Sequence, residues 1–350
     1  MNRQEGGVVF ESVSKFFGAV AAVDNVSFDV ASGELVTLLG PSGCGKTTTL
    51  RMVAGLESAS QGRVLIGGVD VTRLPANERD VSMVFQSYAL FPHMNVLENV
   101  AYGPTVSGDR AAKEKALEKL RMVGLNAFAS RMPSELSGGQ QQRVAVARAL
   151  VLEPQVLLFD EPLSNLDAKL RRRVREEIRE LQQSLGLTVA YVTHDQQEAL
   201  AVSDRIIVMS NARIAQIGEP RELYEAPRDR FVADFIGDAN LVDAELGAHR
   251  GSRAPVRLGG LEVELEHRGV APGAVRVAIR PESILLKRDG SSQLRGTISK
   301  SAYLGTHMEY TVTAPVGQLF VVDRDVSRPI PAGAEVSILL SDHGVALVPS

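Results

Sequence analysis

The sequence predicts an α/β domain followed by a small all-β domain. Up to about residue 238, short apolar runs alternate with helical patterns, which is typical of a largely parallel sheet covered by helices. One of these runs, ELVTLLG (34–40), leads directly into the glycine-rich stretch GPSGCGKT (40–47). From about residue 239 the chain reads as short strands broken by Gly and Pro, as in a small barrel or sandwich.

Length and composition agree with this division. The 350 residues suffice for about two domains at roughly 150 residues each. Hydrophobic residues make up 44% and charged residues 23%, as in ordinary globular proteins, and the net charge of −4 gives no electrostatic reason to expect nucleic-acid binding. Cys44 is the single cysteine, which excludes an internal disulfide and fits a reducing cytosol.

No segment is predicted to cross a membrane. The uncharged stretch 81–97 contains Gln86 and Pro92 and is shorter than the about 20 mostly apolar residues of a membrane span. The N-terminal MNRQEGGVVF lacks the apolar core of a signal peptide. Any membrane role is therefore expected to depend on a partner.

The elements follow one another in a regular order. Strands are predicted at 34–40, 81–86, 156–162 and 187–194, a hairpin at 206–220, and helices at 47–56, 111–123, 140–151, 168–185 and 196–201. The charge run RRRVREEIRE (171–180) is interpreted as a solvated helix face rather than an interaction patch.

The stretch GPSGCGKT fits the glycine-rich phosphate-binding pattern at every fixed position and lies between a strand and a helix. Gly40, Gly43 and Gly45 let backbone N–H groups turn toward phosphates. Lys46 supplies a charge to the β- and γ-phosphates, and the Thr47 hydroxyl can bind Mg²⁺. Cys44 is interpreted as a small tolerated residue rather than a nucleophile. The remaining predicted nucleotide contacts of this stretch are Pro41, Ser42, Cys44 and Thr48.

Carboxylates follow the apolar strand VLLFDE (156–161). Asp160 is predicted to hold Mg²⁺ through water, and Glu161 to polarise the water that attacks the γ-phosphate. His194 ends another apolar strand, so we favour contact with the γ-phosphate over an ordinary surface or core histidine. Gln86 ends the run VSMVFQ and could touch Mg²⁺ or the attacking water, although simple turn polarity is an alternative.

The stretch LSGGQQQRVAVARAL (136–150) begins a helix with two glycines, each of which lowers helix propensity by about 1 kcal/mol. Bare N–H groups at that end, together with the helix dipole, favour an anion, and Ser137 adds a hydroxyl.

These motifs together resemble the ATP-binding cassette (ABC) ATPases. The LSGGQ sequence (136–140) upstream of VLLFDE is similar to the family signature, and the resemblance covers residues 8 to about 240. It implies a P-loop NTPase cassette at 1–238, a helical signature subdomain at about 92–154, hydrolysis of ATP to ADP and phosphate with Mg²⁺, and a homodimer around two ATP. SYALFPHM (87–94) resembles the segment that meets a membrane-embedded partner.

The resemblance also implies further site residues. Phe17 takes the place of the aromatic residue that stacks on adenine, with Val23 nearby. SNLD (164–167), which includes Asp167, matches the loop that crosses the dimer interface. The anion at the signature helix would be the γ-phosphate held by the other subunit, contacted by Ser137, Gly138, Gly139 and Gln140.

The region after about residue 239 indicates which kind of ABC ATPase the chain resembles. FIGDAN (235–240), AIRPESILL (278–286) and YLGTHMEYTV (303–312) resemble the oligonucleotide-fold-like accessory domain of bacterial solute importers, placed here at 239–350. This likeness implies an ion-transport ATPase peripheral to the cytoplasmic face of the inner membrane, with a permease and an external solute-binding protein as partners and no nucleic acid. FIGDAN looks most like the ferric-iron branch, with polyamine importers next.

Two other functions remain as alternatives. A soluble cassette ATPase acting on nucleic acid or ribosomes usually carries two cassettes and basic linkers, whereas this chain carries one cassette. A nucleotide-binding regulator without turnover would lack Glu161 or LSGGQ, and both are present. The tail histidines lack metal-ligand spacing and are interpreted as scattered surface residues; they are His249, His267, His307 and His343.

Overall fold

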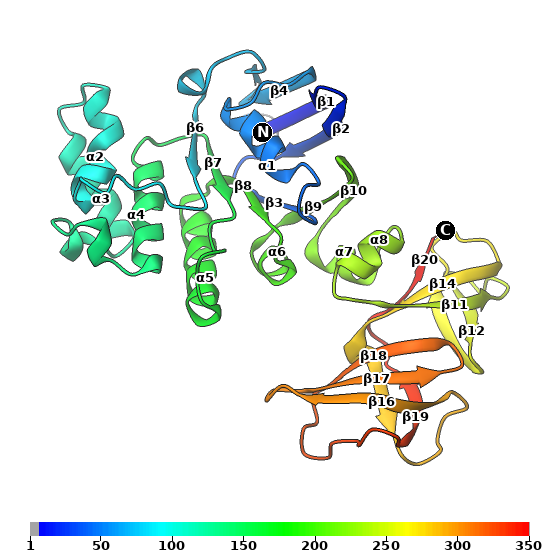
Figure 1. Cartoon of the computed structure of the whole chain (residues 1–350). Coiled ribbons are helices and arrows are strands. Elements are labelled where there is room, and N and C mark those ends of the chain that lie inside the picture. Colours follow the sequence, from blue (N-terminus) through cyan, green and yellow to red (C-terminus); the bar gives the residue numbers. More distant parts are fainter. Residues whose placement is uncertain (1–6, 350) are drawn as a thin grey trace. The chain divides into compact units, whose positions relative to one another are not determined.

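The computed structural model describes residues 7–349. It divides the chain into two compact units, one ending at Ile217 and the other beginning at Gly218 (Figure 1).

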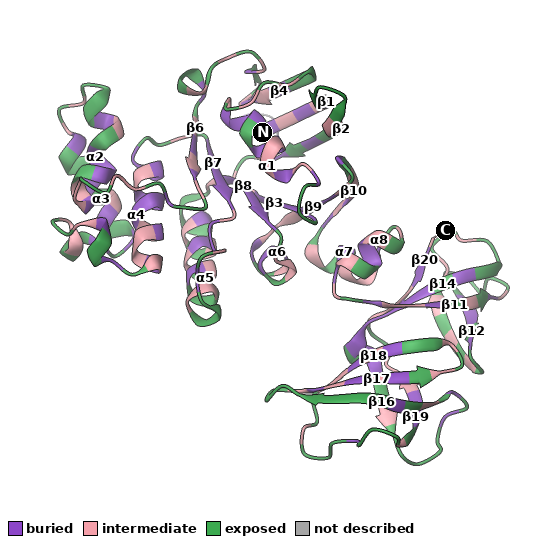
Figure 2. Cartoon of the chain, in the orientation of Figure 1, coloured by how far each residue is buried: buried purple, intermediate pink, exposed green. Residues whose placement is uncertain are grey.

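The first unit is built around a sheet in the order β10-β9-β3-β8-β7-β6, in which β9, β3, β8, β7 and β6 run parallel. Every residue of β3, β7 and β8 is buried, so these strands appear in the sequence as continuous apolar runs (Figure 2). The strands are β3 (Leu35–Leu39), β6 (Val81–Val84), β7 (Val156–Asp160), β8 (Thr188–Thr193), β9 (Arg205–Ser210) and β10 (Arg213–Gly218). The predicted α/β architecture is confirmed.

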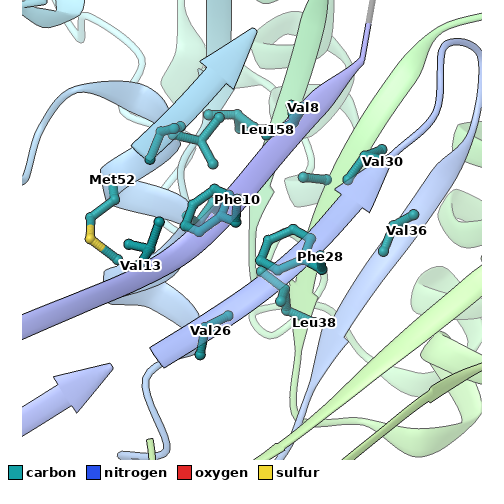
Figure 3. Close-up of a cluster of buried hydrophobic side chains, with 14 of the residues drawn as sticks. Val8, Phe10, Val13, Val26, Phe28, Val30, Val36, Leu38, Met52 and Leu158 are labelled. Atoms are coloured by element: carbon teal, nitrogen blue, oxygen red, sulfur yellow. The ribbon is translucent and has the colours of Figure 1, made fainter. Parts of the chain in front are cut away.

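A second, antiparallel sheet in the order β2-β1-β4-β5 was not predicted from the sequence. Its strands are β1 (Val8–Phe17), β2 (Val20–Val30), β4 (Gln61–Ile66) and β5 (Val69–Asp70). The main core of this unit joins both sheets to helix α1 (Lys46–Ala54). The rings of Phe10 and Phe28 stack with centroids 4.5 Å apart. Figure 3 shows them near Leu38 and Leu158 of the parallel sheet.

The helices α2, α3 and α4 lie together to one side of the parallel sheet and share their own apolar cluster (Figure 1). They fall within the range 92–154, which the sequence assigns to a helical subdomain. The helices of this unit after α1 are α2 (Val96–Val106), α3 (Ala112–Met122), α4 (Gly138–Leu150), α5 (Ala168–Leu185) and α6 (Gln196–Val202).

The second unit consists of two antiparallel sheets, in the orders β13-β12-β11-β14-β20 and β15-β19-β16-β17-β18, around one apolar core. This agrees with the predicted all-β tail. The strands are β11 (Asn240–Leu246), β12 (Arg253–Leu258), β13 (Leu261–Glu266), β14 (Gly273–Ile279), β15 (Ile284–Lys287), β16 (Arg295–Tyr303), β17 (Met308–Ala314), β18 (Gly317–Asp323), β19 (Glu335–Leu340) and β20 (Val345–Val348).

Two short helices, α7 (Pro220–Glu225) and α8 (Arg230–Phe235), also belong to the second unit. Arg280, which is only 1% exposed, donates hydrogen bonds to the carbonyl oxygens of Tyr224, Ala233 and Ile236. These bonds fasten both helices to the sheets. The boundary at 238/239 stays a prediction from the sequence. In the structure the compact units divide between Ile217 and Gly218, and the guanidinium of Arg280 ties α7 and α8 to the β-rich unit.

Candidate nucleotide site

The glycine-rich loop connects the end of β3 to the start of α1 and approaches neighbouring backbone closely. A Cβ added at Gly40 would lie 2.3 Å from the carbonyl oxygen of Met209, and one at Gly45 would lie 2.4 Å from that of Ala22. Gly45 also has φ of 106°, a left-handed conformation that favours glycine. The loop is thus a cradle without side chains at these two positions, as binding of a polyphosphate requires.

Lys46 places its ammonium group inside this loop. The residue is 5% exposed, and Nζ donates to the carbonyl oxygens of Gly40 at 2.8 Å and Pro41 at 2.9 Å. The neighbouring Cys44 is buried, and burial raises the pKa of its thiol. A neutral, buried thiol agrees with the interpretation of Cys44 as a tolerated small residue.

Thr47 and Asp160 meet at the carboxyl end of β7. Thr47 Oγ1 donates a hydrogen bond to Asp160 Oδ1 at 3.2 Å. Burial raises the pKa of the Asp160 carboxyl, while the hydrogen bond from Thr47 acts in the opposite direction. Hydroxyl and carboxylate oxygens are the ligands that Mg²⁺ prefers, usually one or two from the protein and the rest from phosphates and water. The pair fits such an ion. Elsewhere in residues 7–349 no group of three or more His, Cys, Asp or Glu side chains could hold a metal.

Gln86 is exposed and lies two residues beyond the end of β6, the strand next to β7. Its carbonyl oxygen accepts a hydrogen bond from Asn165 Nδ2 at 2.9 Å. The backbone of Gln86 is therefore tied to the segment 164–167, a connection that the sequence does not reveal.

Glu161 and His194 come from the ends of adjacent strands and lie in contact. Glu161 Oε2 is 3.1 Å from His194 Nδ1, and the Glu161 N–H donates to the carbonyl oxygen of Val192 at 3.0 Å. Glu161 has φ of 45°, so its backbone turns sharply where β7 ends. The two residues were assigned to one site from separate strands, and the structure brings them together.

The exposed ring of Phe17 lies at the end of β1, and 52% of the residue is accessible. Lys15 Nζ is 4.9 Å from the ring centroid and also forms an ion pair with Glu57 at 2.6 Å. Val23 is buried on β2, where a Cβ at Gly45 would lie 3.3 Å from its side chain. An accessible aromatic face and a contact with the phosphate loop are what the predicted adenine platform requires.

Helix α4 begins immediately after Ser137, which caps it. Ser137 Oγ accepts from the Gln140 N–H at 3.4 Å, and Gln140 Oε1 accepts from the Ser137 N–H at 2.9 Å. A Cβ at Gly138 would lie 3.1 Å from the Leu166 side chain, and one at Gly139 would lie 2.9 Å from that of Leu170. The glycines therefore have a local packing role in addition to the predicted anion contact. Asp167 caps α5 by accepting from the Leu170 N–H at 3.0 Å.

Arg171 is a site residue that sequence reasoning missed. Within the charge run, Arg172 and Arg173 form the expected surface pairs with Glu176 and Glu177. Arg171 instead donates to the Leu166 carbonyl at 3.1 Å and to Asp195 Oδ2 at 3.4 Å. It thereby joins the segment before α5 to the loop that carries His194.

The tail histidines are less scattered than predicted. His249 and His267 stack with ring centroids 3.8 Å apart, and each hydrogen-bonds a backbone carbonyl oxygen through Nε2. The two residues lie in segments outside the strands and far apart in the sequence, which hides their proximity.

Comparison with known proteins shows which family the chain belongs to. The profile of the family described as ABC transporter matches residues 23–164, and that of the TOBE domain matches residues 277–347. The Fe(3+) ions import ATP-binding protein FbpC of Rhizobium etli is 59% identical over 345 residues, covering 98% of each chain. The protein of the same name from Pasteurella multocida is 46% identical over 348 residues, covering 97% of each chain. This chain belongs to the ABC transporter ATP-binding family.

Solved structures support the same assignment. A dimeric ATP-binding cassette in a post-hydrolysis state, bound to ADP and Pi, is 34% identical with a TM-score of 0.54, covering 61% of this chain and 99% of that one. A nucleotide-free cassette from an ABC transporter is 28% identical with a TM-score of 0.55; the match covers 61% of this chain and 90% of that one. As a member of this family the chain is a nucleotide-binding ATPase. Among residues 7–349, no helix has the length and apolar character needed to traverse a bilayer.

Proposed function

We propose that the chain is the ATP-hydrolysing subunit of a ferric-iron importer. Relatives named as Fe(3+) import ATP-binding proteins match nearly the whole length, including the β-rich tail. These names favour iron over the polyamine alternative that the sequence left open. The observation that carries the ATPase role is the convergence of Lys46, the Thr47–Asp160 pair and the Glu161–His194 pair on one edge of the sheet.

Each of these groups has a proposed task. The loop N–H groups and Lys46 bind the β- and γ-phosphates of ATP. Thr47, Asp160 and Gln86 hold Mg²⁺, which when bound neutralises charge on the phosphates. Glu161 orients the attacking water and accepts its proton. The hydrogen bond from His194 fixes the Glu161 carboxylate, and its exposed ring is free to contact the γ-phosphate.

The site is proposed to be completed by a second copy of the chain. Ser137, Gly138, Gly139 and Gln140 would face the γ-phosphate of the partner's nucleotide, and Asp167 would lie at the same interface. The dimeric cassette bound to ADP and Pi supports this arrangement. The positive end of the α4 dipole is the physical reason for an anion there.

A membrane permease is the second proposed partner, on the cytoplasmic face of the inner membrane, with an external solute-binding protein in the same system. Within the suggested docking segment 87–94, Tyr88 is 6% exposed and Leu90 packs against two apolar clusters, so both have a core role. The Phe91 ring packs at a tilt against that of Tyr102, with centroids 4.7 Å apart, and Tyr102 is 41% exposed. We therefore assign the contact to Phe91 and Tyr102.

The ATPase assignment is tested by measuring phosphate release from Lys46→Ala and Glu161→Gln. Lys46→Ala should lose hydrolysis, because the cation that positions the phosphates is gone. Glu161→Gln should bind ATP yet hydrolyse it at least about a hundredfold more slowly, because the carboxylate that accepts the proton is absent. Lys115→Ala, which changes a half-exposed lysine on α3, is the control. Near-normal hydrolysis by Lys46→Ala would refute the assignment.

The solute is tested separately in cells that carry the whole system. Uptake of radiolabelled ferric iron should require this chain and should fail with Lys46→Ala. Uptake of a polyamine such as putrescine, with no uptake of iron, would overturn the choice of solute and leave the ATPase role intact.

A further inference from the structure

The loop after β6 holds two consecutive residues in a conformation that their side chains disfavour. Tyr88 has φ of 61° and Ala89 has φ of 48°, both in the left-handed region. A residue with a Cβ rarely adopts this region because the Cβ crowds the following carbonyl oxygen. Such a conformation persists only where the surrounding structure enforces it. The same loop carries Gln86, two residues earlier.

One guanidinium group binds both strained residues. Arg148 Nη1 donates to the carbonyl oxygen of Ala89 at 2.7 Å, and Nη2 donates to that of Tyr88 at 2.8 Å. The planar fork of an arginine suits two adjacent acceptors, and a charged donor strengthens both bonds. The guanidinium also lies 5.6 Å from the centroid of the Phe91 ring. Arg148 therefore contacts the loop at three residues, Tyr88, Ala89 and Phe91.

Arg148 belongs to the last turn of α4, whose first turn contains the signature glycines. A single helix thus connects the signature to the loop after β6. Asn165 holds the other side of that loop through its 2.9 Å hydrogen bond to the Gln86 carbonyl oxygen. Gln86 is consequently positioned between the signature helix and the segment 164–167.

We propose that Arg148 is a positioning residue of the ATPase site, which fixes Gln86 by clamping Tyr88 and Ala89 to the signature helix. The inference rests on the proposed role of Gln86 at the Mg²⁺ side of the site. A shift of α4, as when its N-terminus meets a partner's nucleotide, is passed to Gln86 through the two hydrogen bonds of Arg148. Lys46 donates its hydrogen bonds to the carbonyl oxygens of Gly40 and Pro41 in its own loop, whereas Arg148 donates to those of Tyr88 and Ala89.

The main experiment compares Arg148→Met with the wild-type full chain. Methionine keeps an unbranched side chain of similar reach but removes both donors. We expect kcat for ATP hydrolysis to fall about tenfold and the Mg²⁺ concentration for half-maximal hydrolysis to rise severalfold. Binding of ATP without Mg²⁺ should stay unchanged, because the phosphate loop is intact. Arg143→Met is the matched control, since Arg143 lies on the same helix but donates to the Val123 carbonyl at 3.3 Å; its Mg²⁺ dependence should match the wild type.

A second substitution separates positioning from simple stabilisation. Ala89→Gly lowers the cost of the left-handed conformation, because glycine has no Cβ. Added to Arg148→Met, it should restore kcat severalfold and return the Mg²⁺ dependence toward the wild-type value. Unchanged kinetics in folded Arg148→Met, or a defect that Ala89→Gly leaves as it is, would overturn the inference. If Arg148→Met does not fold, Arg148→Lys decides: a partial rise in the half-maximal Mg²⁺ concentration supports the clamp, and an unchanged value refutes it.

The variant Gln86→Ala shows whether a failed test concerns the positioning role of Arg148 or the role of Gln86 on which it rests. If the wild type hydrolyses ATP and Gln86→Ala retains full rate and Mg²⁺ dependence, the proposed role of Gln86 fails, and the positioning role of Arg148 fails with it. If Gln86→Ala is impaired while Arg148→Met is normal, the inference about Arg148 alone fails.

Discussion

Replacement of Arg280 by methionine should loosen α7 and α8 from the β-rich unit. The guanidinium is almost fully buried, donates to three backbone carbonyl oxygens and lies 4.1 Å from the centroid of the Tyr224 ring. A hydrogen bond from a charged donor contributes about 1.5 kcal/mol at the low end of its range, so three of them amount to about 4–5 kcal/mol. Methionine retains the apolar part of the side chain, and the loss is therefore assigned to the hydrogen bonds.

For a unit of this size, each kcal/mol lowers Tm by about 3–5 °C, so the second unit should melt about 15 °C earlier. Calorimetry of the full chain measures this shift, and hydrogen exchange locates it in residues 220–236. Arg276→Met is the control, because that arginine lies on β14, the strand that ends one residue before Arg280, but its side chain is 47% exposed and pairs with exposed Asp243. This change should cost less than about 1 kcal/mol. A comparably small loss for Arg280→Met, or exchange that spares 220–236, would refute the reasoning.

Three further predictions address charge, the signature and the domain boundary. Burial raises the pKa of the Glu198 carboxyl above its ordinary 4.5, so the native state binds this proton more tightly than the unfolded state. The stability of the wild type therefore falls as the pH rises above 4.5 and the carboxyl loses its proton. Glu198→Gln cannot lose this proton, so its stability relative to the wild type should increase between pH 4 and 8 in denaturant titrations; a difference that stays constant with pH would contradict this. Gly139→Asp should abolish ATP hydrolysis, and a mixture of this variant with Lys46→Ala should regain part of the wild-type rate. Gly139→Ala, which adds the Cβ without the charge, should retain more activity than Gly139→Asp. Equal loss in the two Gly139 variants would argue against repulsion of a phosphate. A chain ending at Ile217 should be monodisperse by size-exclusion chromatography and bind ATP, whereas one ending at Ala239 should associate because α7 and α8 lose Arg280; identical elution behaviour would contradict the boundary.

The parts of the fold that could be predicted are those with continuous patterns. β3, β7 and β8 are buried along their whole length, so each forms an unbroken apolar run that ends in a functional residue. β1 was missed because bulges interrupt its pairing with β2, and its buried positions do not alternate regularly. α2 was also missed, although the capping box formed by Asn95 and Glu98 is a readable signal for its start.

The candidate site divides in the same way. Lys46, Glu161 and His194 lie in contiguous motifs, so their residue types and spacing are visible in the sequence. Arg148 and Arg280 act on backbone carbonyl oxygens of distant segments. A carbonyl oxygen is common to every residue and leaves no pattern in the sequence, so these partners required the structure.

The glycines of the signature show how one motif can satisfy two constraints. The sequence explains them by an anion that approaches the start of α4, yet Leu166 and Leu170 of the same chain already pack where Cβ atoms would lie. Those leucines flank Asp167, and Asn165 in the same segment holds the Gln86 carbonyl oxygen. A larger residue at Gly138 or Gly139 would therefore have to push aside the end of the Leu166 or Leu170 side chain before any partner subunit is present. Loss of activity after such a substitution can therefore come from contacts within one chain or from contacts between two subunits. Comparing a neutral with a charged replacement separates these two causes.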